Sequence, residues 1–565
     1  MYEHIVKPLE KAGADGLHLA SGDGLVRRAH PLLAIYACDY PEQITVTCAR
    51  YGDCAECQII EEMMGEGTAL YPVRDLVKVL HGPDAFKEAC KDAGAKAVFD
   101  AFWKDLPYSN IFRSIAPDIL HQLYQGVIKH LKNWVITAYG AAEIDARCRR
   151  LPPNHHVRLF VNRISSLSRL TGQEHNDIAR FLLSIIVDIP LPGGFSTNKD
   201  IFVDLGVRPH FRLPKLHFLN HYIWKIKYFG SLDNSNTEYT ERLHIDMTKD
   251  AYRASNRKDE YMQMTKWLDR KEKILKHQNF IAWRVAGCPP IQRFDHWLPL
   301  VRIPRTLELP KRATILSITI SRAQKTYSAP YLLPSLARLT RQLRSPQELS
   351  RSRQAEDGVL EEVKALATSI SAYSIIRFIH HDPITGSKHT IDSIHSQPGR
   401  KDRRGRPVPG RFDAALVRVV TDERTSPLKA YRIGQVRLIF SLSHDIMSQL
   451  FASIPYANWP KHFTYIEWLS PFKSAPDEVH LLHKISRVRF IDGGGLASVV
   501  DVADIIRSVP LAPRFGKVAD RSWTSSNVME KCNEFYVNPY PSTTDSCIYY
   551  EIILASFMNV TSSIM

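Results

Sequence analysis

Two short ligand pairs, far apart in the sequence, constrain the fold of this chain more than any other feature. Cys54 and Cys57 form a CxxC pair, and 160 residues later His217 and His221 lie four positions apart in "LHFLNHYIW". Two thiolates and two imidazoles are the donor set of a structural zinc site, and histidines at i and i+4 share one helical face. A Cys2His2 site would tie the first pair to a distant helix. The alternative is two inert thiols and a packed or solvated histidine pair.

Apolar periodicity predicts an α/β region, an α region and a β region in that order. Residues 25–44 read as a buried strand that ends at Asp39, and residues 44–57 as a second short strand. From about 70 to 190, apolar residues recur at helical spacing. Residues 380–411 read as a turn-rich linker, and the short alternating segments after it predict a small β domain, which we expect to be a barrel.

Charge favours a polyanionic partner. The 565 residues include 74 Lys and Arg against 59 Asp and Glu, a formal net charge of +15. Such a balance is typical of nucleic-acid binding, although a basic surface also serves solubility. The N-terminus has no secretory signal and no apolar run is long enough to span a bilayer. We expect an intracellular protein, and "RKDRRGR" (400–406) is a candidate nuclear signal.

A long charged helix predicted over 248–279 is the candidate DNA-binding surface. Lysines and arginines on such a helix neutralise phosphates, which supplies most non-specific affinity. A solvated helix with i,i+4 ion pairs such as Asp269–Lys273 explains the same pattern. The basic residues that we expect to contact DNA are Arg253, Arg257, Lys258, Lys266, Arg270 and Lys271.

Carboxylates flank both ligand pairs. A zinc clip would draw Asp39 toward Glu238, and converging carboxylates are what two Mg²⁺ or Mn²⁺ ions need for phosphoryl transfer. Each acid also has a structural explanation, because Asp39 can cap a turn before Pro41 and Glu238 can cap a helix. Asp118 lies at a helix start in "PDILHQLYQG", with His121 one turn on. This pair is either structural or close to an active site.

The chain resembles the Plavaka transposases of fungal DNA transposons, which are related to the CACTA and Kyakuja–Dileera–Zisupton groups. The resemblance rests on "DGLVRRAHPLLAIYACDYPEQ", "CAEC", "PDILHQLYQGVIKHL" and "NTEYTERLHIDMTKDAYRASNRKDEYMQMTKWLDRKEKI". It implies cut-and-paste transposition by an RNase H-like core with an Asp-Asp-Glu metal site and an all-α insertion. Asp39 matches the second catalytic Asp, with Asp118 as the alternative. Glu238 matches the final Glu, with Glu241 as the competing candidate. The family's zinc clip is matched by Cys54, Cys57, His217 and His221. A D-x-x-H signature of uncertain role is matched by Asp118 and His121.

The resemblance also implies a first catalytic Asp on an earlier strand. The chain opens at what reads as the following helix, "YEHIVKPLEKAG", and Asp15 and Asp23 are poor substitutes. We therefore expect a catalytically incomplete, transposon-derived protein, through truncation, decay or an incomplete gene model. The alternative is a non-catalytic protein that is cross-linked by a structural zinc ion and binds DNA or another protein. A homo-oligomer is possible in either case.

These interpretations give six expected segments. They are a remnant of an RNase H-like core with the CxxC pair (1–66), an all-α insertion (67–211), a zinc-histidine helix with the final Glu and a basic helix (212–290), a mixed basic region and linker (291–411), a small β domain (412–540) and a tail (541–565).

Overall fold

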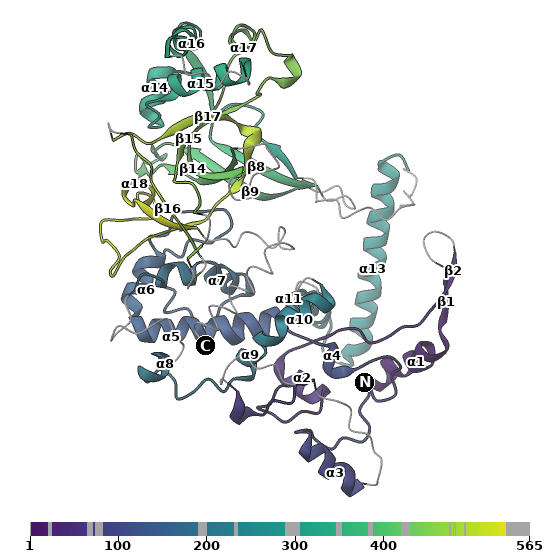
Figure 1. Cartoon of the computed structure of the whole chain (residues 1–565). Coiled ribbons are helices and arrows are strands. Elements are labelled where there is room, and N and C mark those ends of the chain that lie inside the picture. Colours follow the sequence, from purple (N-terminus) through teal and green to yellow (C-terminus); the bar gives the residue numbers. More distant parts are fainter. Residues whose placement is uncertain are drawn as a thin grey trace. The chain divides into compact units, whose positions relative to one another are not determined.

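A computed structural model of the chain divides into two compact units (Figure 1). Unit 1 comprises the described residues within Met1–Lys132 and Lys199–Val301, and unit 2 those within Asn133–Asn198 and Arg302–Val560. The structure describes residues 2–20, 25–64, 72–73, 83–189, 201–230, 235–288, 305–345, 353–381, 388–419, 430–473, 476–477, 480, 482–490 and 493–537. The expected tail, 541–565, lies outside these residues.

Unit 1 opens with a helix, a hairpin and a short parallel strand pair. These elements are α1 (Tyr2–Asp15), β1 (Leu17–Ala20) paired with β2 (Val26–Ala29), and β3 (Tyr36–Ala37) paired with β4 (Ile115–Ala116). In the parallel pair Ala37 lies opposite Ala116. Asp39 and Asp118 therefore follow their strands at matching positions, at the end where parallel strands carry their carboxyl termini.

The prediction of a strand over residues 44–57 is wrong, because a helix begins directly after Asp39 and includes the first residues of that segment. Helix α2 spans Tyr40–Val46, with the Asp39 side chain accepting a hydrogen bond from the Glu42 N–H and Pro41 in the first turn. A capping aspartate followed by proline and an acid is a helix-start signal that outweighs the β propensity of the "ITVT" residues. The single strand expected over 25–44 is likewise split into β2 and β3.

The rest of unit 1 is helical. Its elements are η1 (Glu61–Met63), α3 (Pro83–Asp92), α4 (Ile111–Ser114), the π-helix η2 (Ile119–Ile128), α8 (Ile201–Asp204), α9 (Pro214–His217), α10 (Leu219–Phe229), α11 (Glu238–Leu243), the π-helix η5 (His244–Lys249), α12 (Asp250–Arg253) and α13 (Glu260–Val285). Helix α5 (Lys129–Tyr139) contains the boundary between the units. Buried apolar side chains from α2, β4, η2 and α10 form the core, including Ile44, Ile115, Ile119 and Tyr222.

The long charged helix expected over 248–279 is interrupted. Helix α12 ends at Arg253 and α13 begins at Glu260, with Arg257 (φ 63°) and Asp259 (φ 44°) in the left-handed region between them. Helix α13 then runs for 26 residues, none of them buried (Figure 1). Such a helix is held by few contacts along its length and presents its polar side chains to solvent.

Unit 2 is built on open sheets. The described strands do not close into a barrel, so our prediction of a barrel is wrong. A seven-stranded sheet has the order β17-β15-β14-β13-β18, with β7 pairing β14 and β6 pairing β7. A four-stranded sheet has the order β12-β9-β8-β5, and a three-stranded sheet the order β16-β20-β19. The strands are β5 (Arg305–Glu308), β6 (Ile315–Thr319), β7 (Ser369–Tyr373), β8 (Ile375–His381), β9 (Lys388–Gln397), β12 (Arg411–Phe412), β13 (Ala414–Arg418), β14 (Tyr431–Ser441), β15 (Phe463–Trp468), β16 (His483–Ser486), β17 (Ala497–Asp501), β18 (Ile505–Ser508), β19 (Leu511–Pro513) and β20 (Glu534–Val537).

The β region also begins earlier than expected. The boundary placed between residues 411 and 412 falls inside β12, and the expected linker contains β9 and the small hairpin of β10 (Arg400–Lys401) and β11 (Pro407–Val408). The Asp402 carboxylate accepts the Arg404 and Arg406 N–H groups and so closes the hairpin turn. The charged segment therefore forms a hairpin and not a linker, because the Asp402 side chain caps its turn.

Three apolar layers hold unit 2 together. Figure 1 shows α14 (Ile320–Thr326), α15 (Leu332–Arg344), α16 (Arg353–Leu366) and α17 (His444–Leu450) gathered on one side of the seven-stranded sheet, where Leu336, Val363 and Phe440 share a core. Residues of the four-stranded sheet, such as Ile376 and Ile394, pack with Ile439 in a second core. The third core joins the three-stranded sheet to α18 (Val528–Lys531). The 3-10 helices η7 (Tyr456–Asn458) and η8 (Val502–Asp504) are not part of this core.

Helices α6 (Ala141–Cys148) and α7 (Gly172–Ile186) complete unit 2. The buried Arg147 guanidinium donates to the carbonyls of Ile185, Gly516 and Lys517, which joins them to the C-terminal sheet region. In the expected all-α segment 67–211, the described regular elements are helices apart from β4 and isolated bridges, but residues 149–171 are irregular and the segment is shared between the units. Among the described helices, none is long and apolar enough to cross a membrane.

Candidate metal centre

The metal centre, defined as Cys54, Cys57, His217 and His221, lies inside unit 1. Cys54 and Cys57 follow α2 in an irregular loop, where Cys57 forms an isolated bridge with Val73. His217 ends α9 and His221 lies in the first turn of α10. All four side chains are buried. The structure thus confirms the most constraining sequence prediction, that the two pairs meet.

The donor atoms have the spacing of a tetrahedral site. Cys54 Sγ lies 3.5 Å from His221 Nε2, Cys57 Sγ lies 3.2 Å from His217 Nε2, and the two Nε2 atoms are 3.3 Å apart. All four donors lie within 4.8 Å of one another. Zinc bonds of about 2.3 Å to sulfur and about 2.0 Å to nitrogen give tetrahedral edges of roughly 3.3–3.8 Å. The four residues therefore fit a structural metal such as zinc.

The chemistry of the donors also favours an ion. Burial raises the pKa of the Cys54 thiol, and the nearby histidines offset this only in part. Buried thiols without a cation stay protonated, whereas a metal ion binds the thiolate and reverses that preference. The Nε2 atom of each imidazole faces a thiol, so Nε2 would be the ligand atom and Nδ1 would point away from the ion. A bound zinc would cross-link the loop after α2 to α10.

Two charged side chains beside the metal centre were missed by the sequence analysis. Glu56 lies within the CxxC loop, and Lys225 lies one turn after His221. Glu56 Oε2 is 3.2 Å from Lys225 Nζ, and both side chains are almost fully buried. The signal that could have found them is an acid inside the CxxC spacer together with a lysine that continues the HxxxH spacing.

The acidic cluster is the second group of interest in unit 1, and we define it as Asp39, Asp118, His121 and Glu241. Asp39 and Asp118 both act electrostatically on the Lys215 ammonium and on the His121 ring. Burial lowers the pKa of Lys215, and these two carboxylates oppose that shift. Lys215 also donates to the His121 carbonyl at 3.0 Å. The two aspartates are therefore close in space, as the parallel strands require.

Asp118 is the most completely hydrogen-bonded member of the acidic cluster. Its carboxylate accepts the N–H groups of Leu120, His121 and Thr237, at 3.2, 2.6 and 2.9 Å. It also lies 2.6 Å from His121 Nδ1. Burial alone would raise the pKa of Asp118, but the hydrogen bonds from His121 and Thr237 lower it. Asp118 is thus the cap of η2 and an anchor for the start of α11.

His121 joins Asp118 to Glu241. Its Nε2 lies 2.8 Å from Glu241 Oε1, and the hydrogen bond with Asp118 raises the pKa of His121. Glu238, by contrast, is exposed, and its N–H donates to the Asn236 side chain. Glu241 is therefore linked to Asp118 through His121, whereas the hydrogen bond given for Glu238 is made by its backbone N–H.

No three donors of the acidic cluster converge within 4.8 Å as a Mg²⁺ or Mn²⁺ site would require. Asp39 caps α2, and Asp118 uses both oxygens to accept hydrogen bonds. Within the described ranges, the metal centre is the one group of three or more Cys, His, Asp or Glu donors that converge within 4.8 Å. The observed hydrogen bonds match the capping explanation of Asp39.

The basic residues expected at a DNA surface lie on α12, the following loop and α13. Five of the six are exposed: Arg253, Arg257, Lys258, Lys266 and Arg270. The sixth, Lys271, donates to the Asp246 carbonyl and lies over the Trp267 ring, 4.9 Å from its centroid. This surface is available to a polyanion, with Lys271 fixed in place.

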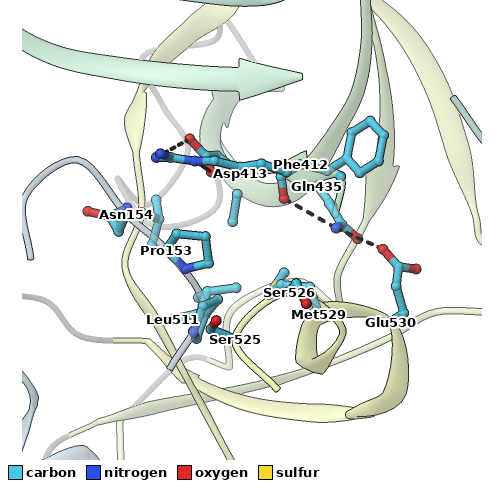
Figure 2. A pocket seen from close by; sticks show the side chains of 15 residues that line it. Pro153, Asn154, Phe412, Asp413, Gln435, Leu511, Ser525, Ser526, Met529 and Glu530 are labelled. Carbon is cyan, nitrogen blue, oxygen red and sulfur yellow. Dashed lines mark hydrogen bonds and ion pairs between the residues drawn. The ribbon is translucent and has the colours of Figure 1, made fainter. Parts of the chain in front are cut away.

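Among the described residues of unit 2, a hollow lies beside the Pro153–Asn154 loop (Figure 2). Its volume is about 30 Å³, which is room for about two water molecules. The polar groups around it are already paired: Arg411 with Asp413, and the Gln435 amide with the Phe412 carbonyl and Glu530. The hollow therefore offers no ligand-sized site.

The comparisons with known proteins bear on unit 1. Residues 1–135 match the family model of the Plavaka transposase. This segment contains β3 and β4, the CxxC half of the metal centre, and Asp39, Asp118 and His121. No curated protein and no solved structure matches the chain. The resemblance inferred from the sequence is therefore confirmed over residues 1–135, the part of the chain that is similar to the Plavaka transposase.

Proposed function

We propose that this chain is a transposon-derived, DNA-binding protein in which one zinc ion cross-links unit 1. The observation that carries the proposal is the convergence of Cys54, Cys57, His217 and His221, whose CxxC half lies in the segment that matches the transposase family model. Zinc would be structural, because four protein ligands leave no open position for substrate. DNA is the partner that matches both the family and the net charge of +15.

The basic side chains of α12 and α13 would contact the DNA backbone. Helix α13 is exposed along its length and carries Lys266 and Arg270 one turn apart. Side chains at i and i+4 lie on one face, so both can reach phosphates of the same strand. Such contacts give affinity without sequence readout, because phosphates carry no base information.

A salt titration tests the DNA surface. Arg270→Gln should weaken binding to any duplex and reduce the slope of log K against log salt by about 1, because one phosphate contact is lost. Lys273→Gln is the matched control, since Lys273 is engaged by Asp269 at 2.6 Å. Binding that is insensitive to salt, or equal in the two variants, would contradict the proposal.

A second candidate function is metal-dependent DNA strand cleavage and transfer by a remnant of an RNase H-like core. The observation that favours it is the parallel β3–β4 pair with Asp39 and Asp118 at matching positions and Glu241 nearby. Three donors of the acidic cluster do not converge within 4.8 Å, so cleavage would require the cluster to rearrange. Incubating supercoiled plasmid with Mn²⁺ tests this: nicking that Glu241→Gln abolishes supports cleavage, and the absence of nicking leaves DNA binding as the function.

A further inference from the structure

The buried charged pair Glu56–Lys225 adjoins the metal centre. Glu56 is 2% exposed and Lys225 is 1% exposed. Their charged atoms, Oε2 and Nζ, are 3.2 Å apart, and the contact is an ion pair and not an aligned hydrogen bond. Lys225 Nζ also donates to the Arg113 carbonyl at 2.8 Å. Charged side chains are rarely buried this deeply, so their location calls for a specific role.

Each member of the pair is attached to one half of the metal centre. Glu56 is the residue before Cys57, and Lys225 follows His221 by one helical turn. The pair therefore bridges the same two elements that the metal ion would bridge. Lys225 is further held between aromatic rings, with Nζ 4.7 Å from the Trp224 centroid and 5.4 Å from the Phe229 centroid.

Glu56 also faces the outer nitrogen of a ligand histidine. Its Oε2 lies 3.8 Å from His221 Nδ1, while His221 Nε2 faces the thiols. A metal-bound imidazole usually donates its other N–H to a carboxylate, which fixes the ring orientation and strengthens the ligand. At 3.8 Å the contact is electrostatic, and a small movement on metal binding would make it a hydrogen bond.

Net charge explains why the carboxylate needs a lysine. A zinc ion with two thiolates and two neutral imidazoles carries no net charge, so the metal centre does not compensate Glu56. Lys225 supplies that compensation. The two side chains therefore pair with each other at 3.2 Å inside unit 1.

We propose that Glu56 and Lys225 act as a unit that positions His221 and the CxxC loop, and that they set the affinity of unit 1 for its metal. This inference rests on the proposed zinc site. Glu56 is a positioning residue that acts through His221, and Lys225 holds Glu56. Neither residue ligates the ion.

The test measures metal affinity and the ligand field in the full-length chain. Zinc affinity is obtained by competition with a chromophoric chelator, and the Co²⁺-substituted protein reports coordination through its d–d and thiolate charge-transfer bands. Glu56→Gln should weaken zinc binding by about 10- to 100-fold and shift the d–d bands, with the thiolate bands retained. Lys225→Met should also weaken binding, and the double variant should resemble Glu56→Gln, because residues that act as a unit are not additive.

Glu362→Gln is the matched control, because Glu362 pairs with Arg344 at 2.6 Å in unit 2, whereas the metal centre belongs to unit 1. It should lower thermal stability without changing zinc affinity. If Glu56→Gln does the same, with the wild-type cobalt spectrum, the pair is only structural and the inference is overturned. Additive losses in the double variant would equally overturn it.

Two further results keep the outcomes separate. A folded wild-type chain that binds neither Zn²⁺ nor Co²⁺ would refute the proposed zinc site itself. If Glu56→Gln fails to fold, Glu56→Asp replaces it, because it keeps the charge and shortens the side chain by one methylene. An affinity between those of wild type and Lys225→Met is then expected, and wild-type affinity would contradict the inference.

Discussion

The metal centre and the acidic cluster are assembled from neighbouring elements of unit 1, yet their side chains are used in opposite ways. In the metal centre, four donors from two distant segments point at one another at distances of 3.2–3.5 Å. In the acidic cluster, the carboxylates of Asp39 and Asp118 point at backbone N–H groups. The comparison teaches that the first group is organised for an ion, whereas the second is organised to cap helices and join them.

The largest expected effect comes from removing a ligand. Cys57→Ser or His221→Ala should lower the zinc content from about one ion per chain to about zero and destabilise unit 1, because structural zinc contributes about 10 kcal/mol or more to folding in small domains. Elemental analysis and chelator-induced unfolding measure both effects. Cys90→Ser is the control, since Cys90 is buried in α3 of the same unit and outside the metal centre. A folded Cys57→Ser or His221→Ala variant that retains its zinc would contradict the view that the metal centre is organised for an ion.

The second effect tests whether Asp118 is a structural cap. Asp118→Ala leaves three N–H groups and the His121 ring without their acceptor, and should cost about 3–5 kcal/mol of unfolding free energy. Urea denaturation of the zinc-loaded chain measures it. Asp39→Ala, which removes one cap contact from α2, should cost only about 1 kcal/mol. Equal and small losses would mean that neither carboxylate is held by its caps.

The sequence predicted the local features of both groups and one long-range feature, the meeting of the CxxC and HxxxH pairs, but not which glutamate of α11 contacts His121. CxxC and HxxxH each bring two donors close together, and "PDIL" encodes a capped helix start, so the grouping of Cys54 with His217 and the helix start at Asp118 could be predicted. The choice of Glu241 over Glu238 depends on how α11 meets η2 through His121, which no local pattern specifies. The missed helix α2 shows that "DYPE" decided the local fold against the β-branched residues after it.

The third effect is a pH dependence at His121. Because Asp118 raises the pKa of His121, the folded protein binds this proton more tightly than the unfolded chain. The stabilisation is fully present below about pH 6.5, the ordinary histidine value, and is lost as pH rises through the raised value. His121→Gln should remove about 1 kcal/mol at pH 6 and progressively less at higher pH. Thermal unfolding of both chains across this range measures the difference, and a constant difference would contradict it.

The smallest effect separates the two glutamates of α11. Glu241 is half-exposed and pairs with His121, so Glu241→Gln should lower stability by about 0.5 kcal/mol at pH 6, as expected for a partly exposed ion pair. Glu238 is exposed and its side chain does not enter the acidic cluster, so Glu238→Gln should leave the unfolding midpoint unchanged. The two substitutions are chemically identical and three positions apart in one helix, so each controls for the other. A larger loss for Glu238→Gln would show that Glu238, as the sequence first indicated, is the acid that faces the two aspartates. The contrast would then extend to DNA cleavage, because the glutamate that faces the aspartates is the one whose removal should abolish any Mn²⁺-dependent nicking.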